Sequence, residues 1–287
     1  MAASEIRSVG VVGLGAMGAG IAQLAIEAGY ETVAREVTDE LGETARGRIQ
    51  HFLRRKVDKG QLDADGRSAA LDRLSVTTRL EDLSGCDLVI EAIVEDLGAK
   101  LALFAELEGI VRSDAILATN TSALSVTEIA AAVAAPERVV GMHFFNPAPL
   151  MPLVEIVRAE LTSDVAVETA YAVGERFGKQ PIRCHDTPGF VVNRVLIPLL
   201  NDCLRVLDEA RVSPEDLDTA LMAGAGWPMG PCTLVDLVGI DVHVHASEAL
   251  YEKLREPRMA PPPRIVAMKN AGLLGRKSGR GFYVYDA

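Results

Sequence analysis

A glycine-rich turn near the beginning of the chain limits what its first half can fold into. Residues 9–12 are an apolar run that predicts a strand, and residues 17–28 have the apolar spacing of a helix, which Gly29 ends. Between the two the chain reads Gly-Leu-Gly-Ala-Met-Gly. A strand, a turn of this composition and a helix in direct succession predict the first βα unit of an α/β fold.

The same turn predicts a nucleotide ligand. Its first glycine allows a tight turn, its second lets the backbone approach a pyrophosphate, and its third lets helix and strand pack closely. The N–H groups at the start of the helix attract phosphate oxygens. We therefore predict that the turn binds a dinucleotide. The predicted cofactor-binding residues of the turn are Gly13, Leu14, Gly15, Ala16, Met17 and Gly18.

An acidic residue beyond the second strand bears on the choice of coenzyme. In dinucleotide-binding units a carboxylate roughly 20 residues after the turn binds the ribose 2′-hydroxyl of NAD and repels the 2′-phosphate of NADP. Glu36 stands at this place. Its neighbour Arg35 has the charge to accommodate that phosphate, which leaves NADP(H) open as the alternative. The carboxylate favours NAD(H).

The rest of the first half alternates short apolar runs with longer amphipathic stretches. This alternation is typical of βα units around a mostly parallel sheet, which is a doubly wound sheet of the Rossmann type. Further strands are predicted at residues 87–93, 115–119, 139–145 and 153–157. Helices are predicted at residues 40–59, 98–111 and 163–178.

The pattern changes near Pro188, and from residue 191 onward no convincing alternating strand is found. Helices are predicted at residues 191–210, 214–223 and 234–254, with a proline-rich connector at residues 257–263. We therefore predict a dinucleotide-binding Rossmann domain at residues 1–186 and an all-helical C-terminal domain at residues 187–287. Four apolar side chains of the first of these helices belong either to a dimer interface or to the bundle core: Leu196, Leu199, Leu200 and Leu204.

Composition excludes several classes of protein. The net charge of −11 at pH 7 argues against a nucleic-acid partner, because neutralising phosphates needs clustered Lys and Arg. No apolar run approaches the roughly 18 residues of a membrane-spanning helix. The four cysteines form no CxxC pair and are expected to be reduced thiols in the cytoplasm. The spacing of cysteines and histidines matches no zinc site, so no metal is expected.

A histidine and a glutamate stand out as candidates for acid–base chemistry. His143 ends a predicted strand, where a side chain can face the crevice in which sheets of this kind bind ligands. Glu155 interrupts the apolar run Leu-Val-Glu-Ile-Val, where a buried carboxylate needs a partner. Paired, the two form a general base, since the carboxylate orients the imidazole and stabilises its protonated form. Taken separately, they are equally compatible with a core histidine and a solvent-facing charge.

Several motifs together resemble the 3-hydroxyacyl-CoA dehydrogenase family. They are Asn-Thr-Ser at residues 120–122, Gly-Met-His-Phe-Phe-Asn-Pro at residues 141–147 followed by Glu155, Pro-Gly-Phe-Val-Val-Asn-Arg at residues 188–194, and Gly-Arg-Lys-Ser-Gly-Arg-Gly-Phe-Tyr at residues 275–283. The match runs nearly from end to end, in the family's order and spacing. It implies NAD(H)-dependent interconversion of 3-hydroxyacyl-CoA and 3-oxoacyl-CoA, with 3-hydroxybutyryl-CoA as the expected substrate.

The resemblance assigns catalytic roles to matching residues. It makes His143 the acid/base that exchanges a proton with the substrate's 3-hydroxyl, and Glu155 its orienting partner. Ser122 matches a serine that hydrogen-bonds the substrate oxygen, and Asn193 an asparagine that holds and polarises the reacting group. From the residues alone, Ser122 is also a candidate N-cap for a helix over residues 123–134, a role compatible with the first.

The resemblance also assigns ligand contacts. Beyond the turn and Glu36, the matching cofactor positions are Glu95, Lys100, Asn146 and Lys277. Arg55 and Lys59 share one helix face and match the place where family members contact CoA, although lysine is usual at the position of Arg55. A solvated basic helix face is the alternative. The family further implies a homodimer formed through the helical domain.

Other activities share part of this pattern. The glycine-rich turn also resembles that of dehydrogenases of free 3-hydroxyacids, but these use a lysine base and lack the pair of His143 and Glu155. An L-gulonate-type sugar-acid dehydrogenase shares fold and pair, and only the basic stretch argues against it. A non-catalytic, crystallin-like protein would need the nucleotide site alone. Ala123 departs from the family, which commonly has a second serine there. We expect a stand-alone dehydrogenase without a hydratase-like region.

Overall fold

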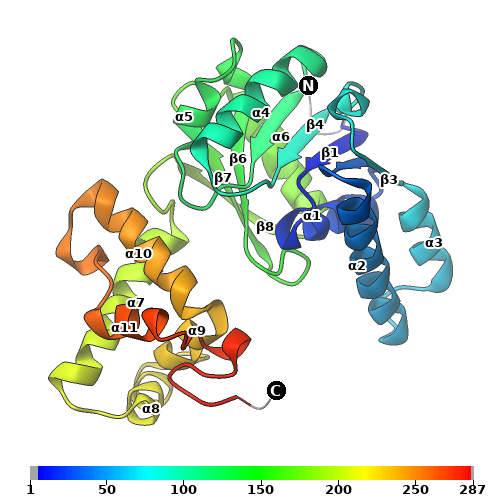
Figure 1. Ribbon diagram of the computed structural model, residues 1–287. Helices are drawn as coiled ribbons and strands as arrows, with labels where there is room; N and C mark the ends of the chain where they lie inside the picture. Colours follow the sequence, from blue (N-terminus) through cyan, green and yellow to red (C-terminus); the bar gives the residue numbers. More distant parts are fainter. Residues whose placement is uncertain (1–5, 286–287) are drawn as a thin grey trace. The chain divides into compact units, whose positions relative to one another are not determined.

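The computed structural model describes residues 6–285, so the ends of the two predicted domains lie outside the described residues. The chain divides into two compact units, Met1–Thr187 and Pro188–Ala287. The first is built on an eight-stranded sheet in the order β3-β2-β1-β4-β5-β6-β7-β8 (Figure 1). The strands are β1 (Ser8–Val12), β2 (Glu31–Arg35), β3 (Leu74–Thr77), β4 (Leu88–Glu91), β5 (Ile116–Thr119), β6 (Val139–Phe144), β7 (Leu153–Arg158) and β8 (Gln180–His185).

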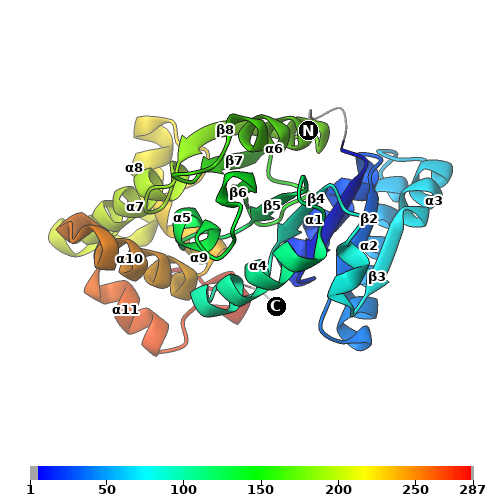
Figure 2. The same ribbon diagram turned by 90° about the horizontal axis from the view of Figure 1, so that it is seen from above.

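All pairings in this sheet are parallel except that of β6 with β7, which is antiparallel. Helices cover both faces: α1, α2 and α6 share one apolar core with the strands, while α4 and α5 lie on the opposite side from α6 (Figure 2). This doubly wound arrangement confirms the predicted fold class. The helices are α1 (Ala16–Glu27), α2 (Asp39–Asp58), α3 (Ala64–Asp72), α4 (Leu97–Ile110), α5 (Val126–Ala130) and α6 (Asp164–Arg176).

Three of these elements were not predicted from the sequence. Strand β3 has only four residues, and β8 is an edge strand with the polar sequence Gln-Pro-Ile-Arg-Cys-His. An edge strand that is half exposed lacks the apolar run by which strands are recognised. Helix α3 is nine residues long and buries a single alanine, so its apolar spacing is equally weak.

The predicted helix over residues 123–134 is wrong. Helix α5 spans only Val126–Ala130, and its N-cap is Ser125, whose side chain accepts a hydrogen bond from the Glu128 backbone N–H. Ser122 therefore does not cap a helix. It lies in the loop that connects β5 to α5, with its side chain available for another role.

The second unit is helical, and the part of it that the structure describes contains isolated β-bridges but no strand. Its helices are α7 (Val192–Glu209), α8 (Pro214–Ala225), α9 (Pro231–Val238), α10 (Ile240–Leu254) and α11 (Pro263–Asn270). The prediction of one helix over residues 234–254 is wrong, because Gly239 has a φ of 105° and ends α9 before α10 begins. Within the predicted connector, Pro257–Met259 forms a 3-10 turn. Helix α11 begins at Pro263, the last residue of that connector.

The four leucines of α7 that were assigned either to the bundle core or to a dimer interface differ in their burial. Leu200 and Leu204 are buried in the core of the helical unit, and Leu196 packs against that core. Leu199 is exposed instead, as is its neighbour Val195 on the same helix face. Of the described helices in either unit, none is long and apolar enough to cross a bilayer.

Candidate active site

The predicted acid–base pair forms in the sheet. His143 and Glu155 are direct cross-strand partners in the β6–β7 ladder, and the histidine Nδ1 lies 2.6 Å from a carboxylate oxygen of Glu155. Glu155 is fully buried and His143 is 4% exposed, so the imidazole supplies the partner that the buried carboxylate requires. A carboxylate accepts hydrogen bonds, so Nδ1 carries the hydrogen and donates it. The other ring nitrogen, Nε2, is then the basic atom of the neutral ring.

Ser122 lies at that second nitrogen. Its hydroxyl oxygen is 3.1 Å from Nε2 of His143. The two residues come from different elements, since Ser122 lies in the loop after β5 and His143 lies in β6. The ring of Phe145 lies beside the imidazole, with the ring centroids 4.6 Å apart. A reacting oxygen that lies next to both groups can therefore exchange a proton with Nε2 and form a hydrogen bond with the serine hydroxyl.

The loop that carries Ser122 is held by Glu95. One carboxylate oxygen of Glu95 accepts hydrogen bonds from the Thr121 hydroxyl and from the backbone N–H groups of Ser122 and Ala123, at 2.6 to 3.0 Å. Burial acts to raise the pKa of Glu95, but the Thr121 hydroxyl, Lys100 and these N–H groups outweigh it and hold the pKa below its usual value. Glu95 is thus a carboxylate at neutral pH and anchors the loop by charge-assisted hydrogen bonds.

Behind Glu95 lies a fully buried ion pair. Nζ of Lys100 is 2.5 Å from Glu91 and 3.4 Å from Glu95. The other oxygen of Glu91 accepts a hydrogen bond from the Thr119 hydroxyl at 2.7 Å. Glu91 ends β4 and Thr119 ends β5, so these groups gather where neighbouring parallel strands end.

The glycine-rich turn has the geometry that a pyrophosphate needs. A Cβ on Gly18 would overlap the carbonyl oxygen of Gly13, so only glycine lets helix α1 start so close to the turn. A Cβ on Gly15 would meet nothing within 4 Å, which leaves open space at the N-terminus of the helix. That N-terminus has no side-chain cap and no acidic residue in its first turn. Its N–H groups are therefore available to phosphate oxygens, and the site fits a dinucleotide.

The side chains of Glu36 and Arg35 form hydrogen bonds with different parts of the structure. The Glu36 carboxylate accepts hydrogen bonds from the backbone N–H groups of Leu14 and Val37, at 2.8 and 2.7 Å, so it stands against the glycine-rich turn. Arg35 donates from Nε to the carbonyl oxygen of Thr78 at 3.2 Å and is thereby held toward the β3 side. Of the two, the carboxylate is the one that lies against the turn predicted to bind the dinucleotide.

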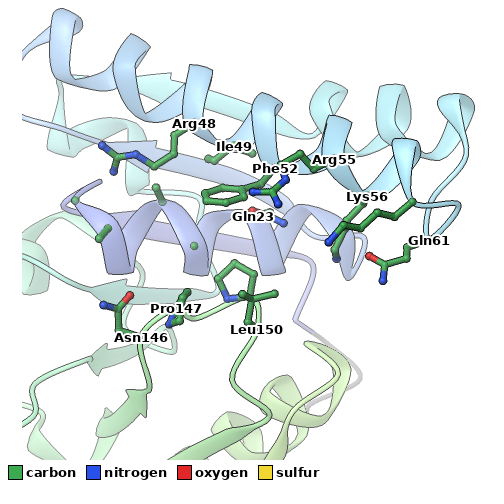
Figure 3. A pocket seen from close by; sticks show the side chains of 16 residues that line it. Gln23, Arg48, Ile49, Phe52, Arg55, Lys56, Gln61, Asn146, Pro147 and Leu150 are labelled. Carbon is green, nitrogen blue, oxygen red and sulfur yellow. The ribbon is translucent and has the colours of Figure 1, made fainter. Parts of the chain in front are cut away.

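A groove of about 490 Å³ opens between α1, α2 and the loop after β6 (Figure 3). The predicted CoA-contacting residues Arg55 and Lys59 line it, and neither forms an ion pair within the described residues. Lys56, which also lines it, is bound instead to Glu27 at 2.5 Å. The groove combines basic groups with apolar walls. Its lining residues are Gly15, Ala16, Ala19, Gly20, Gln23, Arg48, Ile49, Phe52, Arg55, Lys56, Lys59, Gln61, Asn146, Pro147, Pro149 and Leu150.

Comparison with known proteins decides the family. Residues 8–187 match the family model described as "3-hydroxyacyl-CoA dehydrogenase, NAD binding domain", and residues 189–285 match the model of the C-terminal domain. The chain belongs to the 3-hydroxyacyl-CoA dehydrogenase family. Its resemblance to this family is thereby confirmed, and it is an NAD-dependent oxidoreductase.

Relatives of this dehydrogenase match it over nearly their whole length. The 3-hydroxybutyryl-CoA dehydrogenase of Mycobacterium tuberculosis is 45% identical over 282 residues, which are 98% of this chain and 99% of the relative. The probable 3-hydroxybutyryl-CoA dehydrogenase of Bacillus subtilis is 40% identical, with 98% of each chain covered. The solved structure of (S)-3-hydroxybutyryl-CoA dehydrogenase from Ralstonia eutropha has a TM-score of 0.95 and 39% identity, over 99% of this chain and 100% of that one.

Two predicted site residues of the dehydrogenase lie in the helical unit. Asn193 is in the first turn of α7. Lys277 lies in the 3-10 turn Arg276–Ser278 and forms an ion pair with Asp241 at 2.5 Å. In the first unit, Asn146 lines the groove next to the glycine-rich turn. The structure thus gathers Ser122, His143 and Glu155 in one place, with Glu95 and Lys100 behind them.

Some residues of the site were not predicted. Glu91 and Thr119 were missed because nothing in the sequence brings the ends of β4 and β5 together. The sequence did contain an indication for Glu91, since this carboxylate follows an apolar run and, like Glu155 within its own run, would need a partner if buried. Gln23 and Phe52 of the groove follow ordinary helical spacing and gave no signal.

Proposed function

We propose that this dehydrogenase interconverts (S)-3-hydroxybutyryl-CoA and acetoacetyl-CoA with NAD(H). The observation that carries the proposal is the series of contacts from Glu155 through His143 to Ser122, formed on the same sheet as a glycine-rich turn that fits a dinucleotide. The names of the relatives support the four-carbon acyl group. The free-acid, sugar-acid and non-catalytic alternatives lack comparable support.

In the oxidative direction, Nε2 of His143 takes the proton of the 3-hydroxyl group while the hydrogen on C3 leaves with its electron pair. Bound NAD⁺ supplies the acceptor for that hydride. Glu155 holds the ring so that Nδ1 keeps its hydrogen, and its charge stabilises the imidazolium that forms. The Ser122 hydroxyl donates to the substrate oxygen and keeps it near Nε2. In reduction, the imidazolium returns the proton to that oxygen.

The remaining predicted residues take supporting roles in the proposal. Asn193 polarises the reacting carbonyl, and Asn146 and Lys277 contact the cofactor. Glu36 binds the ribose hydroxyls, and the charge on its carboxylate disfavours the 2′-phosphate of NADP(H).

Arg55 and Lys59 bind the phosphates of CoA at one side of the groove. The assignment is supported by their charge, since both are cations that form no ion pair with a described residue in an otherwise acidic chain. Apolar side chains of the groove, such as Phe52 and Leu150, then contact the remainder of the CoA moiety.

Two further features belong to the proposal. The exposed apolar residues of α7, Val195 and Leu199, support a homodimer formed through the helical unit. The four cysteines are free thiols, which supports a reducing, cytoplasmic location.

The test is the initial rate of acetoacetyl-CoA reduction with NADH and with NADPH, beside free acetoacetate and the variant His143→Ala. We expect turnover with NADH, none on the free acid, and a loss of at least about 10²-fold in the variant. No turnover of acetoacetyl-CoA by a protein that still binds NADH would overturn the proposed substrate. Longer 3-oxoacyl thioesters and sugar acids would then distinguish a different chain length from a different substrate class.

A further inference from the structure

We propose that the buried pair of Glu91 and Lys100 is a positioning device that sets the place of Ser122 through Glu95. Neither Glu91 nor Lys100 touches the reacting atoms in this proposal. It rests on the proposed function, in which the Ser122 hydroxyl holds the substrate oxygen next to His143.

Burial of the lysine is the first observation. Lys100 is 1% exposed and Glu91 is fully buried, although charged groups are expensive to remove from water. The pair is fixed on both sides, since Glu91 also accepts hydrogen bonds from the Thr119 hydroxyl and the Ile93 N–H, each at 2.7 Å. These contacts restrain the position of the buried charges.

The link to the reacting centre is the second observation. Lys100 faces a second carboxylate, that of Glu95, at 3.4 Å. Glu95 in turn accepts hydrogen bonds from Thr121, Ser122 and Ala123, and Ser122 lies 3.1 Å from Nε2 of His143. A continuous series of contacts therefore runs from the end of β4 to His143, and those made by Glu91, Lys100 and Glu95 are charge-assisted.

The positioning role is compatible with the cofactor contact that the family resemblance implies for Lys100. Its ammonium group has three N–H donors, and the two carboxylates beside it use at most two of them. The Glu95 side chain is 40% exposed. In the proposal, Lys100 acts on Ser122 through Glu95 and the loop that Glu95 holds.

The experiment is a pair of double-mutant cycles against Ser122→Ala. The rate of hydride transfer from NADH to acetoacetyl-CoA is measured in single turnovers, and the dissociation constant of NADH by fluorescence. Lys100→Met keeps the length of the side chain and removes its charge. We expect this variant to slow hydride transfer about 10-fold or more when NADH is saturating.

The decisive arm is the double variant. If Lys100 acts through Ser122, then Lys100→Met slows the Ser122→Ala enzyme no further. A merely structural role slows both backgrounds equally and overturns the proposal. Hydride transfer at the wild-type rate in Lys100→Met, with NADH saturating, also overturns it.

Glu95→Gln repeats the cycle at a partly exposed position, so it decides the matter if Lys100→Met does not fold. Glu106→Gln, at an exposed position of the same helix, is the matched control and should leave rates unchanged. The wild-type and Ser122→Ala arms test the proposed function separately. Failure of the wild type to reduce acetoacetyl-CoA contradicts that function, whereas additive losses in an active enzyme contradict only the positioning device.

Discussion

His143 and Glu155 face each other directly across an antiparallel ladder, with Nδ1 of the histidine 2.6 Å from the carboxylate. Directly opposed residues in such a ladder are held by the backbone of both strands. The pair is therefore set by the sheet and not by a mobile loop. Rigid placement of this kind is what a proton-transferring group requires.

Replacing Glu155 by Gln should lower kcat by about 10²-fold or more and change KM little. Glutamine fills the same space, but it has no charge to stabilise the imidazolium, and its amide can turn an N–H group toward Nδ1. Steady-state rates with acetoacetyl-CoA measure the loss. In the His143→Ala background the same substitution should cost almost nothing, because the residue it serves is gone. Equal losses in both backgrounds would mean that Glu155 acts independently of His143.

Two glycines of the nucleotide turn should respond differently to alanine. A Cβ on Gly15 projects into open space, so Gly15→Ala should weaken NADH binding about tenfold and leave the unfolding transition unchanged. A Cβ on Gly18 overlaps the backbone of Gly13, so Gly18→Ala should lower both affinity and stability. NADH titrations and thermal unfolding of the apoenzymes separate the two effects. Unchanged NADH affinity in Gly15→Ala would place the pyrophosphate elsewhere.

Glu36, and not Arg35, should decide the choice of coenzyme. Removing the charge in Glu36→Ser should raise the ratio of kcat/KM for NADPH over NADH by about tenfold, since a repulsive charge beside the 2′-phosphate disappears. Arg35 is held at the Thr78 carbonyl, so Arg35→Gln should leave the ratio unchanged. A drop in NADPH use in Arg35→Gln would show that this side chain reaches the nucleotide.

The basic groups of the groove should affect only substrates that carry the CoA nucleotide. Arg55→Gln and Lys59→Gln should each raise KM for acetoacetyl-CoA about tenfold, a loss of ~1.4 kcal/mol in binding, with kcat unchanged. Arg54→Gln is the matched control, because Arg54 is exposed on the same helix but does not line the groove. With acetoacetyl-pantetheine, which lacks the nucleotide, all three variants should match the wild type. An equal effect on both thioesters would assign Arg55 and Lys59 a role away from the CoA phosphates.

The sequence was sufficient for the parts of the site whose chemistry shows in a single residue. Glu155 in an apolar run indicated either a buried partner or a solvent-facing charge, and the family resemblance favoured the partner; the glycines of the turn indicated a close approach of backbone. The sequence did not show how the strands pair. Strands β6 and β7 run antiparallel, and this brings His143 opposite Glu155, twelve positions later in the chain. Both features depend on the turn between the strands and on the order of strands in the sheet.

The elements that could not be predicted share a physical cause. Strand β8 is polar because it lies at the edge of the sheet, and edge position is a property of the whole fold. The burial of Lys100 is likewise tertiary, since its helix brings it over the ends of β4 and β5. The break between α9 and α10 was detectable, because Gly239 stands in the middle of the stretch, but an isolated glycine does not by itself end a helix.

The stability of the helical unit should depend on pH through a buried histidine. His243 donates from Nε2 to Asn201, and burial lowers the pKa of His243 to about 4 from the usual 6.5. Between these two pH values the folded state holds fewer protons than the unfolded state, so the free energy of unfolding falls as the pH is lowered through this range. The loss should approach ~3 kcal/mol at the acid end.

Guanidinium unfolding at pH 7, 6 and 5, followed by the fluorescence of Trp227, measures this dependence. Trp227 is the single tryptophan of the chain and packs against the core of the helical unit, so its signal reports on that unit. His243→Gln replaces the donor with one that does not titrate, and it should flatten the loss between pH 7 and 5. His245→Gln, at an exposed position of the same helix, should retain the wild-type slope. If His243→Gln loses stability with acid as steeply as the wild type, the titrating group lies elsewhere in the unit.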